Sequence, residues 1–419
     1  MKTALSTEAP ARRATPGILL LGPAFVAAIA YVDPGNVAAN LTAGAKYGYL
    51  LVWVLVAANL MGMMVQYQSA KLGLVTGSSL PELLGRRFPT WGRRLFWLQA
   101  EAVALATDLA EVVGGAIALK LLFGLPLLGG GLIVGAASMA LLSMQSRRRQ
   151  RAFENAVIVL LAIITVGFLC GLLVSPPDAG GVLGGLAPRF EDGGSVMLAA
   201  SMLGATVMPH AIYVHSALAR DRHRPRGTAA PDEPTLRRLL RATRWDVVTA
   251  LAIAGVVNIG MLLLAASALA GREGTDSIEG AHAAIAQTLG PAIGVIFAVG
   301  LLASGLASTS VGSYAGATIM EGLLKIRIPL LARRVITLIP ALVVLAVGVD
   351  PTLVLVLSQV ALSFGIPFAL IPLILMSRDR RLMGAHADGR ALQLTAVLST
   401  VLVVILNGFL IWLSVTGTA

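Results

Sequence analysis

Two short motifs place possible cation ligands inside apolar stretches of the chain: residues 33–36 (Asp-Pro-Gly-Asn) and 208–210 (Met-Pro-His). Asp33 offers a carboxylate, Asn36 an amide oxygen and Met208 a thioether. Mg²⁺ and Ca²⁺ take oxygen ligands, whereas a thioether suits softer transition metals. This combination therefore predicts a site for Mn²⁺, Fe²⁺ and related ions that discriminates against the alkaline earths.

Both motifs also interrupt what would otherwise be a continuous apolar helix. Proline removes a backbone donor and glycine loosens the backbone, so a helix breaks where they occur together. A carboxylate such as Asp33 costs several kcal/mol in mid-membrane unless it faces a cavity or a partner. We therefore expect the two breaks to form a cation-binding site. The alternative is a kinked helix in which a neutral Asp33 bonds a neighbour. His210 is a metal ligand or a proton carrier, since histidine titrates near neutral pH.

Three acidic residues, Glu101, Asp108 and Glu111, are spaced to share roughly one face of a helix. Acidic residues on one stripe inside a membrane suggest a proton relay. Arg333 and Arg334 open a later apolar segment and could pair with the inner acids. The alternative interpretation is a purely structural network of ion pairs.

The remaining polar residues inside apolar segments carry weaker signals. Gln66, Asn258 and Gln359, each taken alone, are expected to form hydrogen bonds between helices. Cys170 is the single cysteine, so it forms no internal disulfide and no cysteine metal site. We interpret Cys170 as a small buried apolar residue.

The elements that must hold these residues are membrane-spanning helices. The chain has 419 residues, of which 57% are hydrophobic and 13% charged, whereas soluble domains carry roughly 25% charged residues. Many apolar runs reach the ~20 residues that cross a bilayer, and such runs form helices rather than barrel strands. The first is read as a spanning helix, not a cleavable signal peptide. We predict eleven spans: 17–45, 49–72, 93–122, 127–145, 153–175, 194–218, 246–270, 291–322, 333–349, 352–376 and 391–416.

The charged residues in the loops alternate between the two sides of this arrangement. Only four of the 32 lysines and arginines fall on one side: Lys46, Lys120, Arg189 and Arg272. The positive-inside rule then places the N-terminus in the cytoplasm and the C-terminus outside. Because the basic residues lie in loops between spans, the net charge of +11 does not indicate nucleic-acid binding. The longest polar segment, about 219–245, is expected to be a solvated cytoplasmic loop.

The two breaks occupy matching places, in spans 1 and 6. These spans open two successive groups of five, and an odd number makes the second group enter from the opposite side. This is the inverted-repeat arrangement of many secondary transporters, which bind substrate at discontinuous helices. We predict a cytoplasmic tail at 1–16, a first repeat at 17–175, an inverted second repeat at 194–376 and an additional helix at 391–416.

At this point the residues resemble a known family, the Nramp family of divalent metal transporters. The two break motifs look like its signature motifs. Further similar segments are 204–207 (GATV), 211–216 (AIYVHS), 101–111 (EAVALATDLAE) and 359–368 (QVALSFGIPF). The resemblance covers essentially the whole chain, with no departure at a motif position. A branch of this superfamily that carries Mg²⁺ lacks the methionine, which is present here at Met208.

The resemblance implies an all-α, LeuT-like membrane fold and symport of Mn²⁺ or Fe²⁺ with protons across the cell membrane into the cytoplasm. We further expect a non-enzymatic protein with no cofactor, no nucleic acid and no obligate protein partner; its expected partners are metal ions, protons and the lipid bilayer. Carried over by position, the metal would bind Asp33, Asn36 and Met208, the carbonyls of Ala30 and Ala205, and Gln359. His210 and Glu111 would flank the entrance for protons, and Asp108, Glu101, Arg333 and Arg334 would line their exit. His215 is also shared, without an assigned role.

Three other functions stay open at this stage. A sodium-coupled symporter of organic solutes could have the same fold, although the acids at 101–111 count against it. A passive metal channel would need a continuous polar pore in place of one occluded site. A membrane-embedded metallohydrolase would need a ligand pair such as His-Glu-x-x-His, which the sequence lacks.

Overall fold

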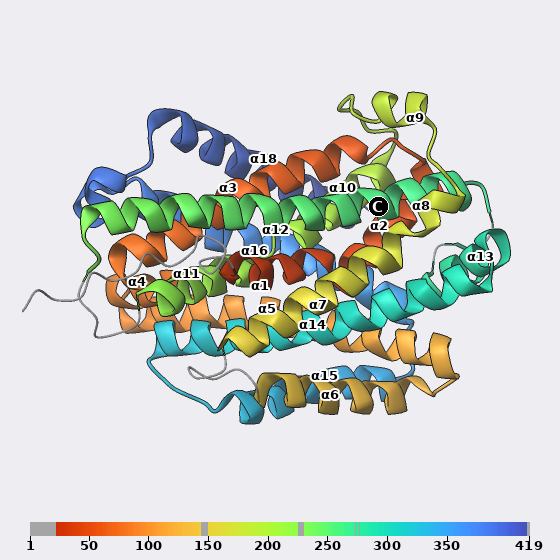
Figure 1. The fold of residues 1–419 in the computed structure, drawn as a ribbon, viewed down its shortest axis with the longest axis horizontal. Coiled ribbons are helices and arrows are strands. Elements are labelled where there is room, and N and C mark those ends of the chain that lie inside the picture. The colour runs from red at the N-terminus through yellow and green to blue at the C-terminus, as the bar shows by residue number, and fades with distance from the viewer. Residues whose placement is uncertain (1–21, 144–149, 225–229, 273, 276, 417–419) are drawn as a thin grey trace, which may run out of the picture.

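The structure is a computed structural model that describes residues 22–143, 150–224, 230–272, 274–275 and 277–416. Within those ranges the chain is almost entirely helical and contains no strand (Figure 1). Among the described residues, eight helical segments are long and apolar enough to cross a membrane. They are Thr90–Phe123 (α5), Ala152–Val174 (α7 and α8), Gly193–His223 (α10 and α11), Glu233–Ala268 (α12), Pro291–Leu324 (α14), Leu330–Val347 (α15), Pro351–Ser377 (α16) and Arg390–Phe409, within α18.

The other three predicted spans, at 17–45, 49–72 and 127–145, coincide with helices that are not among these eight. The first is interrupted and consists of α1 (Pro23–Ile29), the 3₁₀ turn η2 (Ala30–Val32) and α2 (Pro34–Tyr47). The others are α3 (Val52–Thr76) and the shorter apolar helix α6 (Leu127–Ser143). The remaining long helices have the bounds α7 Gln150–Leu169, α8 Gly171–Val174, α10 Gly193–Thr206, α11 Pro209–His223 and α18 Arg390–Thr416.

Several short helices lie between the spans, where the sequence predicted only loops. They are α4 (Leu80–Arg87), α9 (Ala179–Gly184), α13 (Ile278–Leu289), α17 (Arg380–Met383) and η3 (Gly384–His386). Local capping explains α4: the Ser79 hydroxyl accepts from the Glu82 backbone N–H, and the Glu82 carboxylate accepts from the Ser79 N–H. This capping box satisfies donors that a helix start otherwise leaves unpaired.

The prediction of a solvated loop at 219–245 is wrong for most of that segment. Helix α11 continues to His223 and α12 already begins at Glu233, while 225–229 lie outside the described residues. The early part of α12 is amphipathic: Leu236, Leu239 and Leu240 are buried against α3. Their i, i+3, i+4 spacing puts them on one helical face, and packing of that face stabilises the extension.

The long helices lie roughly side by side, with α1 and α2 end to end near the middle (Figure 1). Helix α5 packs against α14 in the interior, and α6 and α15 form a pair at one edge of the bundle. The outer helices expose large apolar side chains, such as Ile336 and Ile339 on α15 and Leu398 and Ile405 on α18. An apolar exterior of this kind is what the hydrocarbon core of a bilayer requires.

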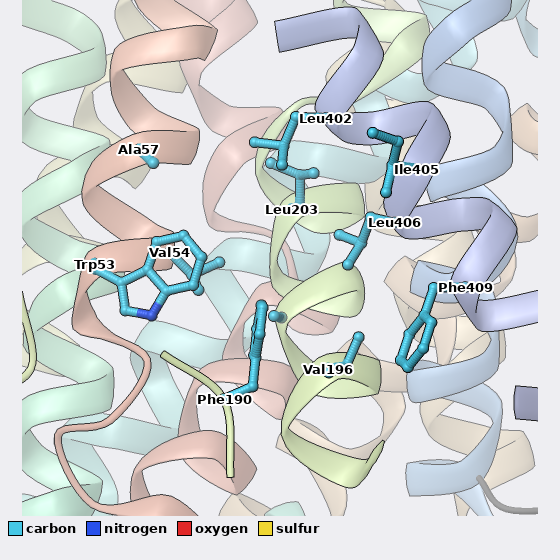
Figure 2. Close-up of a pocket in the computed structure, with 11 residues that line it drawn as sticks. Trp53, Val54, Ala57, Phe190, Val196, Leu203, Leu402, Ile405, Leu406 and Phe409 are labelled. Atoms are coloured by element: carbon cyan, nitrogen blue, oxygen red, sulfur yellow. The ribbon is translucent and has the colours of Figure 1, made fainter. Parts of the chain in front are cut away.

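Helix α18 lies beside α3 and α10 and leaves an apolar crevice there of about 320 Å³ (Figure 2). Trp53 lies on the α3 side of the crevice and Phe409 on the α18 side, with Leu203 of α10 between the two helices. The Trp53 indole N–H donates to the Arg189 carbonyl at 3.3 Å. The crevice has no charged side chain in its lining.

Candidate metal-binding site

The first break is built by the same residues that start the next helix. Asp33 has an extended backbone (φ −72°, ψ 167°) and is the N-cap of α2, with Pro34 at the first helical position. The Asp33 Oδ1 atom accepts from the Asn36 backbone N–H at 2.9 Å. Aspartate is a preferred N-cap, and proline suits the first helical position because its fixed φ matches the helix. The motif therefore ends one helix and begins another within a single turn.

The second break has the same design without a side-chain cap. Helix α10 ends at Thr206, Met208 is the N-cap of α11 with an extended backbone (φ −69°, ψ 123°), and Pro209 occupies the first helical position. In both breaks a helix C-terminus, with its unpaired carbonyls, lies next to a helix N-terminus. Carbonyls at such ends are suited to coordinate a cation in membrane transporters.

Hydrogen bonds join the two breaks. The Asn36 side-chain amide donates to Asp33 Oδ1 at 2.6 Å and to the Ala205 carbonyl at 2.9 Å. The Thr206 hydroxyl donates to Asn36 Oδ1 at 3.4 Å. Met208, two residues further along, is fully buried. The predicted oxygen ligands Asp33, Asn36 and Ala205 thus belong to one hydrogen-bonded group. The Met208 thioether lies in the adjoining segment, and Ala30 is buried in the 3₁₀ turn.

Helix α16 supplies the remaining predicted ligand. The Gln359 side-chain amide donates to Asp33 Oδ2 at 3.3 Å, and Gln359 Oε1 is buried without a hydrogen-bond partner among the described residues. Two glycines permit this approach. A Cβ on Gly35 would overlap the Gln359 side-chain amide, and a Cβ on Gly204 would lie 2.5 Å from the Gln359 carbonyl oxygen.

The whole group is closed off from solvent in this structure. Asp33, Asn36, Met208 and Gln359 each have 0% of their surface exposed, as do Ala30 and Ala205. Within the described residues no cluster of three His, Cys, Asp or Glu side chains is found. The candidate site contains one carboxylate and otherwise amide, thioether and carbonyl donors.

The acidic residues of α5 meet arginines of α15, as the sequence suggested. Arg333 donates to Glu101 at 2.7 Å and Arg334 to Asp108 at 2.6 Å. The Arg334 Nε–H also donates to the Ser138 hydroxyl of α6 at 2.8 Å. Both arginines and Asp108 are buried, so these ion pairs connect α5 and α15 inside the protein.

Glu111 and His210 lie outside those ion pairs. Both are buried, and neither Glu111 carboxylate oxygen has a hydrogen-bond partner within the described part of the chain. His210 Nδ1 lies 3.5 Å from the Thr107 hydroxyl, and its Nε2 is unpaired there. One turn beyond Glu111, Gly114 is so close to Pro34 that a Cβ would overlap the proline ring. Helix α5 thus passes directly beside the first break.

Hydrogen bonds around the breaks include residues that the sequence analysis did not assign to the site. Thr206 approaches Asn36, and Asn258 donates to the Tyr31 carbonyl at 2.6 Å. The expected interhelical hydrogen bonds of Gln66 and Asn258 are confirmed: Gln66 donates to the Tyr31 hydroxyl at 3.0 Å, and its Oε1 lies 2.9 Å from His215 Nδ1. Thr206 could have been found from its position beside the break, whereas nothing local marks Tyr31.

Comparison with known proteins gives a consistent result. The family model described as natural resistance-associated macrophage protein-like (Nramp) matches residues 24–413. The chain is 59% identical over 399 residues to the divalent metal cation transporter MntH of Mycobacterium tuberculosis, covering 95% of this chain and 92% of that protein. It is 44% identical to the MntH of Bacillus subtilis, covering 93% and 91%.

Solved structures agree with the expected fold. A manganese transporter of Eremococcus coleocola superposes with a TM-score of 0.84 at 28% identity, covering 97% of this chain and 90% of that one. MhsT, solved in complex with L-phenylalanine, superposes with a TM-score of 0.61 at 15% identity, covering 94% and 99%. The latter likeness concerns the fold alone. The all-helical, LeuT-like architecture expected from the sequence is confirmed.

Proposed function

Since this chain belongs to the Nramp family, we propose that it is a secondary transporter that imports divalent transition-metal ions, Mn²⁺ and Fe²⁺, together with protons. The names of its relatives, divalent metal cation transporter and manganese transporter, support the cargo. The observation that carries the proposal is the joining of two helix breaks through Asp33, Asn36 and Ala205, with Met208 beside them.

In this proposal the metal binds between the breaks. Asp33 provides the charge, while Asn36, Gln359 and the carbonyls of Ala30 and Ala205 provide oxygen atoms. In this structure the Asn36 side-chain amide donates a hydrogen bond to the Ala205 carbonyl. Metal binding would break that hydrogen bond, and both residues would then coordinate the ion through oxygen. Met208 adds a soft donor, which favours transition metals over Ca²⁺ and Mg²⁺.

Alternating access requires the ligands to separate on one side at a time. Gln359 belongs to α16, whereas Asp33 and Met208 belong to the two broken helices. Movement of α16 would therefore add or remove one ligand. We propose that the two breaks belong to inverted repeats at 17–175 and 194–376, with residues 391–416 as an additional helix. The closed arrangement of the ligands is consistent with an occluded step between two open ones.

Protons would follow a route partly separate from that of the metal. Glu111 and His210 lie buried near the breaks without strong partners, and we assign them to the entrance. The pairs Asp108–Arg334 and Glu101–Arg333 continue along α5, and we assign them to the exit. We further propose that the protein lies in the cell membrane with its N-terminus in the cytoplasm and its C-terminus outside, after a tail at 1–16.

The proposal is tested in proteoliposomes that contain a metal-sensitive dye and a pH-sensitive dye. Mn²⁺ influx should persist in excess Ca²⁺, and metal influx should acidify the lumen. Asp33→Asn should abolish both signals because it removes the only carboxylate among the proposed ligands.

Asp350→Asn is the matched control, since Asp350 is an exposed N-cap of α16. It should transport like the parent protein. Parental transport by Asp33→Asn would overturn the site assignment, and metal influx without acidification would favour uniport.

A further inference from the structure

A second groove lies between the beginning of α5 and the end of α14. None of the residues that line it belongs to the two helix breaks. It has a volume of about 410 Å³. Its wall is mainly apolar and comes from both helices and the residues after α14: Leu95, Trp97, Leu98, Leu323, Leu324 and Ile326. Leu95, Leu98 and Ile326 are more than half exposed, so the groove opens onto the outer surface. In a membrane protein such a surface faces lipid chains.

The groove differs from the crevice of Figure 2 because one part of it is strongly basic. Arg93 and Arg94, in the first turns of α5, both line it. Arg94 is exposed and forms no ion pair among the described residues. Arg93 donates only to neutral oxygens, the Gly85 carbonyl at 3.5 Å and the Thr90 hydroxyl at 3.2 Å. Two positive charges therefore stand beside an apolar wall without an acidic partner.

Two residues of the groove wall also carry an unsatisfied hydrogen-bond donor. The Nε–H of Arg93 and the indole N–H of Trp97 are buried, and neither has a partner in the described part of the chain. Buried donors normally have partners, because an unpaired one costs free energy. A ligand in the groove would reach either donor only after the Arg93 or Trp97 side chain turns toward it, because both atoms are shielded in this structure.

We propose that this groove binds an anionic phospholipid from the leaflet on the arginine-rich side of the protein. The phosphate lies against Arg93 and Arg94, and an acyl chain lies along Leu95, Leu98 and Ile326. Basic pockets between membrane helices are suited to anionic headgroups, and tryptophan favours the level of the headgroups. The inference is independent of the metal site.

Charge and shape together select this occupant. A free phosphate ion would pair with the arginines but leave the apolar wall uncovered. A zwitterionic lipid would bring its own cation near two unpaired arginines. The crevice of Figure 2 offers an internal comparison, because its lining has no cation to discriminate between headgroups.

Tryptophan fluorescence tests the proposal directly, since Trp97 lines the groove and the chain has five tryptophans. A protein that keeps only Trp97, with the other four changed to Phe, is reconstituted in phosphatidylcholine vesicles. Phosphatidylglycerol with brominated acyl chains should quench Trp97 at a mole fraction about fivefold or more below that needed for brominated phosphatidylcholine, given the contribution of each arginine near an anionic headgroup. Equal quenching by both lipids would overturn the proposal.

Three matched proteins separate a specific site from general attraction to a basic surface. Arg93→Gln/Arg94→Gln should lose the preference, and Arg93→Lys/Arg94→Lys should keep most of it. Arg378→Gln/Arg380→Gln removes two exposed charges elsewhere and should leave it unchanged. The same preference in a protein that keeps only Trp53, in the crevice of Figure 2, would show general lipid enrichment and contradict the proposal. A melting temperature in detergent close to that of the parent protein confirms that each variant is folded.

Discussion

At the scale of single residues, Asp33 has two roles that one substitution can separate. Its carboxylate caps α2 through the Asn36 N–H and also stands among the proposed metal ligands. Losing an N-cap costs about 0.5–2 kcal/mol, so Asp33→Ala would combine a folding defect with a binding defect. Asparagine caps a helix as well as aspartate does. The Asp33→Asn variant therefore isolates the contribution of the charge.

Met208 carries the prediction of selectivity. Met208→Leu keeps the volume and apolar character of the side chain but removes the sulfur. We expect Mn²⁺ influx to become sensitive to Ca²⁺, with about tenfold less Ca²⁺ needed for half-inhibition, which corresponds to about 1.4 kcal/mol. The measurement is Mn²⁺ influx into proteoliposomes over a Ca²⁺ series.

Met202 provides the control, because it is a fully buried methionine of α10 one turn before the break. Met202→Leu should leave the Ca²⁺ series unchanged. If Met208→Leu discriminates as well as the parent, the thioether does not determine selectivity.

Gly35 is predicted to act through Gln359. An alanine at Gly35 would overlap the Gln359 amide and push it away from Asp33. Gly35→Ala and Gln359→Ala should each raise the Mn²⁺ concentration for half-maximal influx. Their double variant should resemble Gln359→Ala alone, because the two changes remove the same contact. Additive effects in this double-mutant cycle would show that Gly35 acts on the site by another route.

At the scale of elements, the buried pairs between α5 and α15 can be structural, proton-conducting or both. Removing one partner of a buried ion pair costs about 3–5 kcal/mol, whereas replacing both partners costs much less. Asp108→Asn should therefore lower the melting temperature in detergent, and Asp108→Asn/Arg334→Gln should recover most of it. If the pair conducts protons, neither variant should recover luminal acidification. Recovery of both properties would mean that the pair is only structural.

The exposed pair Arg87–Asp379, at 2.7 Å, is the control for that experiment. The pKa of Asp379 lies below its ordinary value, because the Arg381 backbone N–H and then the Arg87 guanidinium stabilise the carboxylate. Solvent screens this pair, so Asp379→Asn should change the melting temperature much less than Asp108→Asn.

The sequence predicted the long elements well, since spans follow from apolar length and the breaks follow from Pro34 and Pro209. The sequence analysis predicted a loop where α12 extends over 233–245. The arginines of that segment made it look solvated, although Leu236, Leu239 and Leu240 have helical spacing and pack against a neighbour. The short helices α4, α9, α13 and α17 depend on local caps and on neighbours, which hydropathy does not register.

The candidate site was predictable in its chemistry but not in its contacts. Asp33, Asn36 and Met208 stand out because polar groups are rare inside a span. That Gln359 would reach Asp33, and that Gly35 and Gly204 would leave room for it, depends on how α16 packs against both breaks. Such packing joins residues more than 150 positions apart, so no local pattern encodes it.

At the scale of the whole molecule, the outer surface and the loop charges define two separate properties. Exposed apolar side chains on α15 and α18 fit the protein to a bilayer but do not orient it. Orientation depends on the basic loops, since all but four lysines and arginines fall on one predicted side. This asymmetry also explains why the lipid groove with Arg93 and Arg94 is expected in the inner leaflet.

The eleven-span topology gives the last prediction. Fusing alkaline phosphatase after Ala419 should give an active enzyme, because that enzyme matures only outside the cytoplasm. Fusing it after Asp388, behind ten spans, should give an inactive one, and a fluorescent protein should show the reverse pattern. The two sites differ only by α18, so this span alone must invert the signal. Equal activity of both fusions would mean that α18 does not cross the membrane, and active enzyme only after Asp388 would place the N-terminus outside.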